Sequence, residues 1–416
     1  MTKTKALDLG VLARDLAEEQ LKKDEARTAL FPMLLRRKME RMSASPLAFL
    51  RGSAPLFYEL VKAHADLGHG PGGEGWIVGD LHIENFGAYR PDGFDDDKAD
   101  KSKRPAVFDL NDFDDTIIGP WRYDVLRFST SLILAGRELG VTGPVVLDLL
   151  DRVLEAWTKA VFDGETPTTT PACVTALVEK VKARSKTALL EGRTKEEKGK
   201  RRLVRGPRYM DLDPEILDQV PKALEEYIST IREDEKPPKG EQKVEDAAFR
   251  IAGTGSLGGL RMAVIVEGSK ALFDLKEQGD PSTLIVCDDP KMDHGERVIT
   301  GFRACVAHPA ALLGTSHIKL SKSGEPGSPK RRVSLSCRRL SPQEDKLDLP
   351  KLKKEDLPDL ATHLGTLLGD AHRRGAKTKG SRWNKGDRDT VRAQAIALAG
   401  VHEAVYLALC ERMRSL

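Results

Sequence analysis

Cysteine and aromatic residues are scarce in this chain. Only 5 of its 416 residues are Cys, and Phe, Trp and Tyr together make up 5%. The cysteines are odd in number, lie far apart and include no C-x-x-C pair, which argues against both a disulfide framework and a zinc site. We therefore expect free thiols in a reducing, cytoplasmic compartment and no disulfide-linked partner. The five are Cys173, Cys287, Cys305, Cys337 and Cys410.

Long apolar runs and a charge surplus are also missing. No uninterrupted apolar stretch is long enough to cross a bilayer, so we expect no membrane anchor. The 67 basic and 64 acidic residues leave a net charge of only +3, which gives little reason to expect general nucleic-acid binding. The basic stretch 193–208 is read first as a solvated loop or helix face. An anionic-ligand patch is the alternative, and a nucleic-acid role is disfavoured because no aromatic platform accompanies it.

The chain does have enough apolar residues, 40%, to bury a large core in two or three domains or lobes. Helical periodicity covers 9–42, 54–65, 122–162, 356–374 and 387–414, whereas strand-like runs gather between 245 and 345. These patterns predict an α+β protein. Its expected parts are a helical region (1–244), a β-rich region (245–345) and carboxyl-terminal helices (346–416) that return to the first region.

Acidic and amide residues follow two short apolar runs, WIVGDLHIEN and AVFDLNDFDD. The first places Asp80 five residues before Asn85, the spacing at which kinase-type enzymes carry an Asp that orients or deprotonates the acceptor hydroxyl and an Asn that binds Mg²⁺. The second supplies a further carboxylate for the metal, because Mg²⁺ prefers oxygen ligands. Asp112 and Asp109 are the two candidate ligands. His82 belongs to the same catalytic group, as a hydrogen-bonding scaffold more than as a proton carrier.

The segment VGDLHIENF resembles the catalytic loop H-G-D-x-H-x-x-N of aminoglycoside and choline phosphotransferases, in the protein-kinase-like superfamily. In those families a metal-binding Asp and a later Asp follow, and Asp112 and Asp124 match this arrangement. The chain also resembles, over most of its length, the bacterial domain-of-unknown-function family 2252, through SPLAFLRGSA, GDLHIENFG, FDLNDFDD and GPWRYD. These resemblances imply a two-lobed kinase-like fold with ATP and Mg²⁺ as cofactors, and leave the acceptor open.

A glycine-rich segment, GTGSLGG at 253–259, lies between two predicted strands. It resembles a kinase phosphate loop, in which Gly253, Gly255, Ser256 and Gly258 would bind the nucleotide phosphates; an ordinary glycine turn is the alternative. Lys276 follows one strand later, as the phosphate-binding lysine of kinases does. The acidic partner of Lys276 stays open. Glu296 is one candidate, while Thr300 stands where related sequences carry an acid.

The order of these motifs is reversed relative to ordinary kinases, because the glycine segment and lysine come after the catalytic loop. We read this as a circular permutation, in which VSLSCRRL corresponds to the hinge strand and 356–374 to the helix that precedes the catalytic loop.

The predicted function is an ATP- and Mg²⁺-dependent transfer of the γ-phosphate to a hydroxyl group of a small molecule. The alternative is a nucleotide-binding pseudokinase that regulates or binds another protein. Asp124 is expected to support the catalytic loop by accepting backbone N–H bonds, and Arg51 is read as a surface or ion-pair residue.

Overall fold

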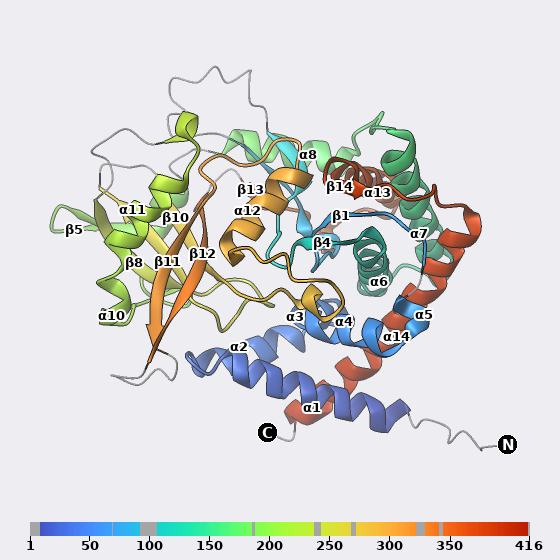
Figure 1. The fold of residues 1–416 in the computed structure, drawn as a ribbon, viewed down its shortest axis with the longest axis horizontal. Helices are drawn as coiled ribbons and strands as arrows, with labels where there is room; N and C mark the ends of the chain where they lie inside the picture. The colour runs from blue at the N-terminus through green and yellow to red at the C-terminus, as the bar shows by residue number, and fades with distance from the viewer. Residues whose placement is uncertain are drawn as a thin grey trace.

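The protein, described here from a computed structural model, is a mixed α+β structure. The described residues are 9–68, 70–91, 106–184, 188–236, 243–267, 272–321, 329–340 and 344–414. A twisted antiparallel sheet occupies one side of the molecule and a group of long helices the other, with α1 (Leu9–Arg27) and α2 (Met33–Met42) running beneath both (Figure 1).

Most of the remaining helices lie on the helical side, whereas α10, α11 and α12 contact the large sheet. The remaining helices are α3 (Pro46–Gly52), α4 (Ala54–Ala63), α5 (Ala65–Gly68), α6 (Trp121–Glu138), α7 (Gly143–Thr158), the π-helix η2 (Lys159–Asp163), α8 (Ala172–Ala183), α9 (Ala188–Arg193), α10 (Pro214–Leu217), α11 (Val220–Thr230), α12 (His294–Cys305), α13 (Leu357–Arg374) and α14 (Lys385–Arg414). Five short 3-10 helices are η1 (Ile83–Asn85), η3 (Glu233–Glu235), η4 (Ser282–Ile285), η5 (Leu349–Lys351) and η6 (Lys354–Asp356).

The strands form one large sheet and three small ones. The large sheet has the order β11 (Gly314–Ser321), β12 (Lys330–Leu340), β10 (Leu272–Gln278), β9 (Arg261–Val266), β8 (Val244–Arg250) and β7 (Tyr209–Met210). The small sheets are β14 (Ala376–Thr378), β1 (Glu74–Ile77) and β4 (Ile117–Pro120); β13 (Glu344–Lys346), β2 (Phe86–Tyr89) and β3 (Val107–Leu110); and the hairpin of β5 (Thr194–Glu197) and β6 (Lys200–Leu203).

Alternation along β10 gives the large sheet two different faces, because successive side chains of a strand point to opposite sides. Phe273 and Leu275 belong to a buried apolar core shared with α11. Asp274, Lys276 and Gln278 face the other way, and the register pairs Lys276 with Ser336 of β12 and Arg261 of β9. One face of this sheet therefore holds the core. The other carries a smaller apolar cluster around Ile265, Leu272 and Leu340 and, beside it, presents polar side chains to the cavity described below.

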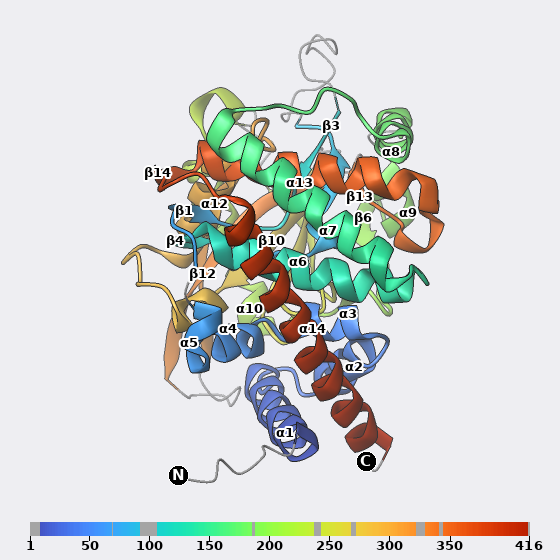
Figure 2. The ribbon, with the colours of Figure 1, turned by 90° about the vertical axis from the view of Figure 1, so that its right-hand side faces the viewer.

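The helical side is organised around α6, whose residues from Trp121 to Gly136 are all buried. Helices α7 and α14 pack against α6, and α13 packs along α7 (Figure 2). The periodicity between 122 and 162 predicted one helical stretch, but the chain reverses direction between α6 and α7. Gly140 adopts φ +61° there, a conformation that glycine reaches without the cost of a side chain.

Two further expectations are modified by the structure. The basic stretch 193–208 is neither a loop nor a helix face but contains the β5–β6 hairpin, where Arg202 and Arg205 bind the carboxylate of Asp246 at 3.3 and 2.9 Å. Among the described residues, α14 is long and apolar enough to cross a membrane, although no such stretch was expected from the sequence. Its side chains Val391, Leu398 and Val405 are buried within this protein, but only 39% of its most apolar stretch is.

The strand predictions around the glycine segment are confirmed. β8 and β9 flank residues 251–260, Lys276 lies on β10, and the VSLSCRRL run lies within β12. The helices predicted at the carboxyl end are α13 and α14. The sheet also includes β7, which comes before residue 245, and α11 packs on β11.

Candidate active site

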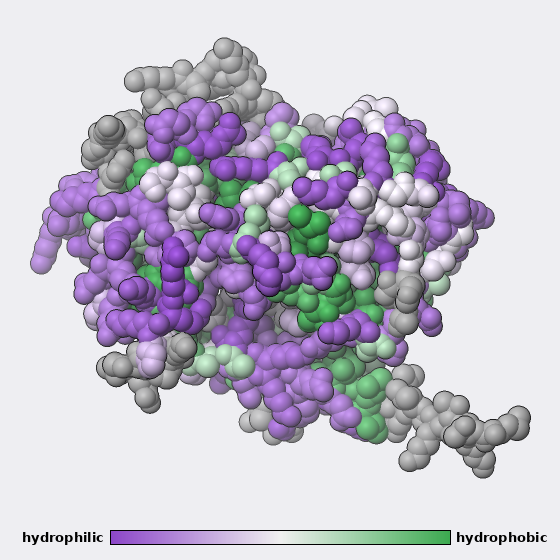
Figure 3. All heavy atoms as spheres, in the orientation of Figure 1, coloured by the Kyte–Doolittle hydropathy of each residue, from purple (hydrophilic) through white to green (hydrophobic). Residues whose placement is uncertain are grey.

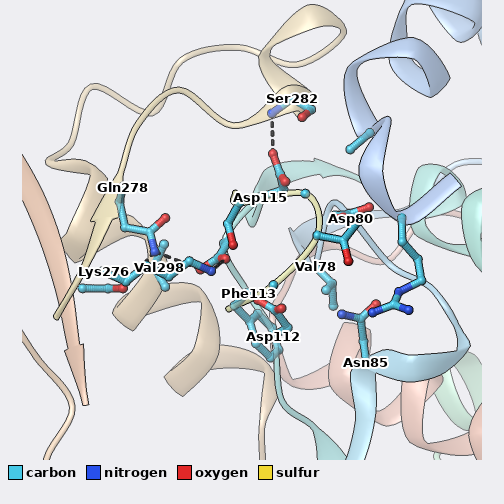
Figure 4. A pocket seen from close by; sticks show the side chains of 18 of the residues that line it. Val78, Asp80, Asn85, Asp112, Phe113, Asp115, Lys276, Gln278, Ser282 and Val298 are labelled. Atoms are coloured by element: carbon cyan, nitrogen blue, oxygen red, sulfur yellow. Dashed lines mark hydrogen bonds and ion pairs between the residues drawn. The ribbon is translucent and has the colours of Figure 1, made fainter. Parts of the chain in front are cut away.

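A cavity of about 480 Å³ lies between the polar face of the large sheet, the helices α1 to α3 and the loops that follow β1 and β3. Both acidic motifs and the glycine segment line it. Figure 4 shows Asp80, Asp112 and Asn85 around one space, with Lys276 and Gln278 approaching from the sheet and Asp115 between them. Segments far apart in the sequence, from Gln20 to Lys346, therefore meet at one place.

The loop after β1 is held from beneath by a buried polar chain. Asp124, in the first turn of α6, accepts hydrogen bonds from the backbone N–H groups of Val78 (2.7 Å) and Gly79 (2.9 Å). His372 of α13 lies with Nε2 3.1 Å from the same carboxylate, and the indole N–H of Trp157 donates to His372 Nδ1 at 3.0 Å. Because Nδ1 accepts this bond, the ring proton lies on Nε2, and the Nε2–H group donates a hydrogen bond to Asp124. The expected supporting role of Asp124 is confirmed.

Asp80 emerges from this loop into the cavity, where its side chain is 24% exposed. Arg127 Nε donates to Asp80 Oδ1 at 3.0 Å, and a second nitrogen of the same guanidinium donates to Leu50 O at 2.8 Å. Burial raises the pKa of Asp80 to about 7; the positive charge of Arg127 opposes this shift, and the negative charges of Asp115 and Asp112 add to it. A carboxyl group with such a pKa can accept a proton near neutral pH.

His82 and Asn85 shape the turn that follows Asp80. His82 Nδ1 accepts the backbone N–H of Glu84 at 3.2 Å, and Asn85 Oδ1 accepts the backbone N–H of His82 at 2.6 Å. Burial lowers the pKa of His82 well below its usual value, and the cations Arg51 and Arg127 lower it further. His82 is therefore a neutral capping group here. The Asn85 oxygen retains a second lone pair for a metal.

The loop after β3 carries three acids with different environments. Lys276 forms an ion pair with Asp114, whose other oxygen accepts Gln278 Nε2 at 2.9 Å. The Asp115 side chain accepts the backbone N–H of Ser282. Asp112 is exposed in the cavity and has no hydrogen bond or ion pair within the described part of the chain. Asp112 is thus the carboxylate left available for a ligand.

Asp109, the competing metal ligand, lies elsewhere. It does not line the cavity, and its carboxylate is 3.9 Å from Arg374. Burial raises the pKa of Asp109 to about 6, while Arg374 opposes the shift. The geometry therefore places Asp112, and not Asp109, beside Asp80 and Asn85.

The acidic partner of Lys276 is Asp114 and not a residue of α12. Glu296 is exposed on α12 and does not line the cavity, and Thr300 is exposed on the same helix. The same helix sends the buried Arg297 toward the acidic loop, where it donates to Asp114 O at 3.0 Å. Asp114 takes the place that Glu296 was considered for. Burial lowers the pKa of Lys276, and the nearby Asp112 carboxylate partly offsets this.

The glycine segment closes over Asp80. A Cβ atom on Gly255 would lie 3.7 Å from Asp80 Oδ2 and 3.0 Å from the carbonyl oxygen of Arg51. Gly253 (φ +83°) and Gly258 (φ +108°) adopt backbone conformations that favour glycine, and Ser256 lines the cavity between them. Arg41 donates to Gly253 O, and Lys38 Nζ lies 3.4 Å from Gly255 O. The loop is therefore fastened by cations of α2.

No group of three or more His, Cys, Asp or Glu side chains in the described ranges has the arrangement of a complete metal site. The donors present still suit Mg²⁺, which keeps several waters and is commonly held by one or two protein oxygens together with phosphates. Asp112 has a free carboxylate, and its charge and that of Asp115 raise the pKa of Asp80. A cation between these acids would relieve that repulsion.

Several site residues were not identified from the sequence. Arg127 binds Asp80, and Asp114 binds Lys276. Lys38 and Arg41 of α2 contact the glycine segment. Asp114 stands in the motif FDLNDFDD and could have been identified from it. Nothing in the periodicity of α2 or α6 distinguishes Lys38, Arg41 and Arg127 from other basic residues. Only the packing of α2 and α6 reveals them.

Comparison with known proteins adds one result. No curated protein and no solved structure matches the chain. One family model matches residues 30–412, nearly the whole chain. The chain belongs to the family described as "Uncharacterized protein conserved in bacteria (DUF2252)".

Proposed function

We propose that this protein is an ATP- and Mg²⁺-dependent phosphotransferase that moves the γ-phosphate to a hydroxyl group of a small molecule. The observation that carries the proposal is the meeting of five groups in one cavity: Asp80, Asn85, Asp112, Lys276 and the glycine segment at Gly255. These are the parts that positioning and charge stabilisation require in phosphoryl transfer.

The proposed step uses each group in a defined way. The acceptor hydroxyl oxygen attacks the γ-phosphorus, the bond from that phosphorus to the β-phosphate oxygen breaks, and the hydroxyl proton passes to Asp80. ADP leaves with the bonding electron pair. Asn85 and Asp112 would hold Mg²⁺, which neutralises charge on the phosphates when bound, and Lys276 would turn from Asp114 toward the α and β phosphates.

The order of elements around the cavity supports a kinase-like arrangement. Two strands joined by the glycine segment, a third strand with Lys276, the helix α12 and then β11 and β12 follow one another as the nucleotide-binding lobe of a kinase would. α13 then leads back to the helical side, where His372 contacts Asp124 beneath the Asp80 loop. This return is what a circularly permuted two-lobed kinase fold requires.

The pseudokinase alternative has one observation in its favour. The cation that would bind phosphates is paired with Asp114 of the acidic loop, and α12 contributes Arg297 instead of an acid. A lysine held by Asp114 would not reach the phosphates, so the protein would bind nucleotide without transferring phosphate.

The test is calorimetric titration with ATP, with and without Mg²⁺ and at fixed ionic strength, for the native chain, Asp112→Asn and the matched control Asp109→Asn. We expect Mg²⁺-dependent binding that weakens at least tenfold in Asp112→Asn and persists in Asp109→Asn. Equal binding by all three proteins would remove Asp112 from the metal site. Absence of ATP binding by the native chain would refute the phosphotransferase and the pseudokinase alike.

Nucleotide binding without transfer needs a second measurement. ADP release over a panel of hydroxyl compounds, with Asp80→Asn as the inactive control, distinguishes the two candidates. Release that depends on both Asp80 and an acceptor supports the enzyme.

A further inference from the structure

The charges that line the cavity are separated into two groups. The loops after β3 and β10 carry the acids Asp112, Asp114, Asp115 and Asp280. On the neighbouring sheet face, Lys276 pairs with Asp114, and Arg261 and Arg338 pair with Asp274. The opposite wall, from α1, α2, α3, η1 and β13, is basic. Its charged lining residues are Lys23, Asp24, Arg27, Lys38, Arg51, Glu84, Glu344 and Lys346, and Glu344 is already paired with Arg338 of β12.

Ion pairs within the basic wall leave part of this charge uncompensated. Lys38 pairs with Asp24 at 2.5 Å, and Lys23 pairs with Glu59 of α4. Two cations, Arg51 and Lys346, share the one carboxylate of Glu84, with Arg51 Nη1 at 3.0 Å.

A third cation faces the same space. Arg27 has no carboxylate partner within the described segments of the chain. The α1–α2 part of the surface is mostly hydrophilic in Figure 3. The wall therefore carries a surplus of positive charge that no side chain described here neutralises.

One buried donor in this wall also lacks an acceptor. Arg51 Nε is buried and makes no hydrogen bond, although Arg51 lines the cavity. A buried guanidinium N–H without a partner costs stability, and an oxyanion supplied by a ligand would satisfy it. The position is close to the reacting groups, because the carbonyl of Arg51 and the carboxylate of Asp80 both approach Gly255.

We propose that the acceptor is a hydroxyl compound that also carries a phosphate or carboxylate group, and that Arg51 and Lys346 bind this anionic group while the hydroxyl lies beside Asp80. This inference rests on the proposed phosphotransferase function. The triphosphate of ATP has its own ligands in Lys276, the glycine segment and the metal. The basic wall is then free for the second substrate, and a polycationic acceptor would be repelled by it.

The experiment uses inorganic phosphate as the probe. Phosphate is titrated by calorimetry into the full chain saturated with Mg²⁺ and a non-hydrolysable ATP analogue, at fixed ionic strength. Lys346→Gln is the main variant because this side chain is half exposed and its loss does not threaten folding; Arg51→Gln is the second. Lys351→Gln is the matched control, a surface lysine that pairs with Asp348 and lies outside the cavity.

We expect phosphate to bind the nucleotide complex and to bind about tenfold more weakly in each of the two variants, since each removes a charge-assisted contact, with no change in the control. Three results would overturn the proposal. Phosphate that competes with the analogue would assign the wall to the nucleotide's own phosphates. Equal binding by the variants and the control would mean an adventitious ion only. If phosphate does not bind to the nucleotide complex, the basic wall is not an anion-binding site.

The proposed function fails separately from this inference, because the analogue's own binding is measured first. If the analogue does not bind but phosphate binding still depends on Lys346, the phosphotransferase proposal falls and the acceptor assignment falls with it. The anion site would then stand alone.

Discussion

The two loops that meet at Asp80 are fastened in different ways. The loop after β1 is held by a fully buried chain of Asp124, His372 and Trp157, which fixes two consecutive backbone N–H groups. The glycine segment between β8 and β9 is held by Arg41 and Lys38, cations of a single amphipathic helix.

Buried hydrogen bonds to charged groups are stronger and less replaceable than partly exposed ones. We therefore expect a rigid half of the site, which presents Asp80, and a more adjustable half, the glycine segment, which is held by the exposed contact of Arg41 as well as by the buried Lys38. The predictions below test this difference, beginning with the group that lies between the two loops.

Replacing Asp80 with Asn should abolish transfer while keeping the fold. The variant keeps a hydrogen-bond acceptor for Arg127 and loses the ability to take up a proton, so turnover should fall about 10²- to 10⁴-fold. ADP release under saturating ATP measures this. Nucleotide affinity should change much less, and an equal loss of affinity and turnover would contradict the assignment of Asp80 as the base.

Breaking the rigid half should lower global stability. Asp124→Ala leaves two backbone N–H groups and His372 without their acceptor, and we expect the free energy of unfolding to fall by about 3 kcal/mol. Urea denaturation followed by circular dichroism measures this change. The control Asp148→Ala removes an exposed carboxylate of α7 and should cost about 0.5 kcal/mol. Similar losses for both variants would show that the buried chain does not hold the loop.

The pKa of Asp80 predicts a pH dependence with a defined sign. The carboxylate form is needed to accept a proton, so kcat/KM should fall about tenfold for each pH unit below about 7. The folded pKa lies above the unfolded one, so ionisation of Asp80 costs the native state stability as pH rises from about 4 to 7, by up to about 1.4 kcal/mol per unit. Asp80→Asn should flatten the unfolding profile in this window. A profile that is unchanged in the variant would assign the titration to another group.

The smallest effect is expected in the adjustable half. Gly258 has φ +108°, and a Cβ there would lie 2.7 Å from Arg27 O, so Gly258→Ala should cost about 1–2 kcal/mol locally. Because this loop is proposed to cover the phosphates, ATP affinity should fall about tenfold, measured by calorimetry, with little change in global unfolding. Gly143→Ala, at an exposed site with nothing within 4 Å, serves as the control. A large global destabilisation by Gly258→Ala would show that this loop is as rigid as the other.

The local patterns of the sequence predicted much of the secondary structure. The strands on either side of the glycine segment, the strand with Lys276 and the last two helices lie where period and composition placed them. The break between α6 and α7 was missed, because both helices have the same apolar period and the reversal is marked only by a short signal, Gly140 followed by the N-cap Thr142 and Pro144. The basic stretch is largely exposed, as expected, but its hairpin was not predicted, and the carboxylate that binds Arg202 and Arg205, that of Asp246, lies 41 residues beyond Arg205.

The sequence by itself determined which chemical groups are available: an Asp and an Asn at a spacing suited to phosphate chemistry, a cluster of acids, a glycine turn and a lysine. The tertiary structure decided which of them meet. In the folded chain Asp112, and not Asp109, lines the cavity, and Lys276 pairs with Asp114. Arg127, Arg41 and Lys346 also lie at the site. Local order along a chain fixes periodicity and turns, whereas the partners of a charged side chain depend on elements that only packing brings together.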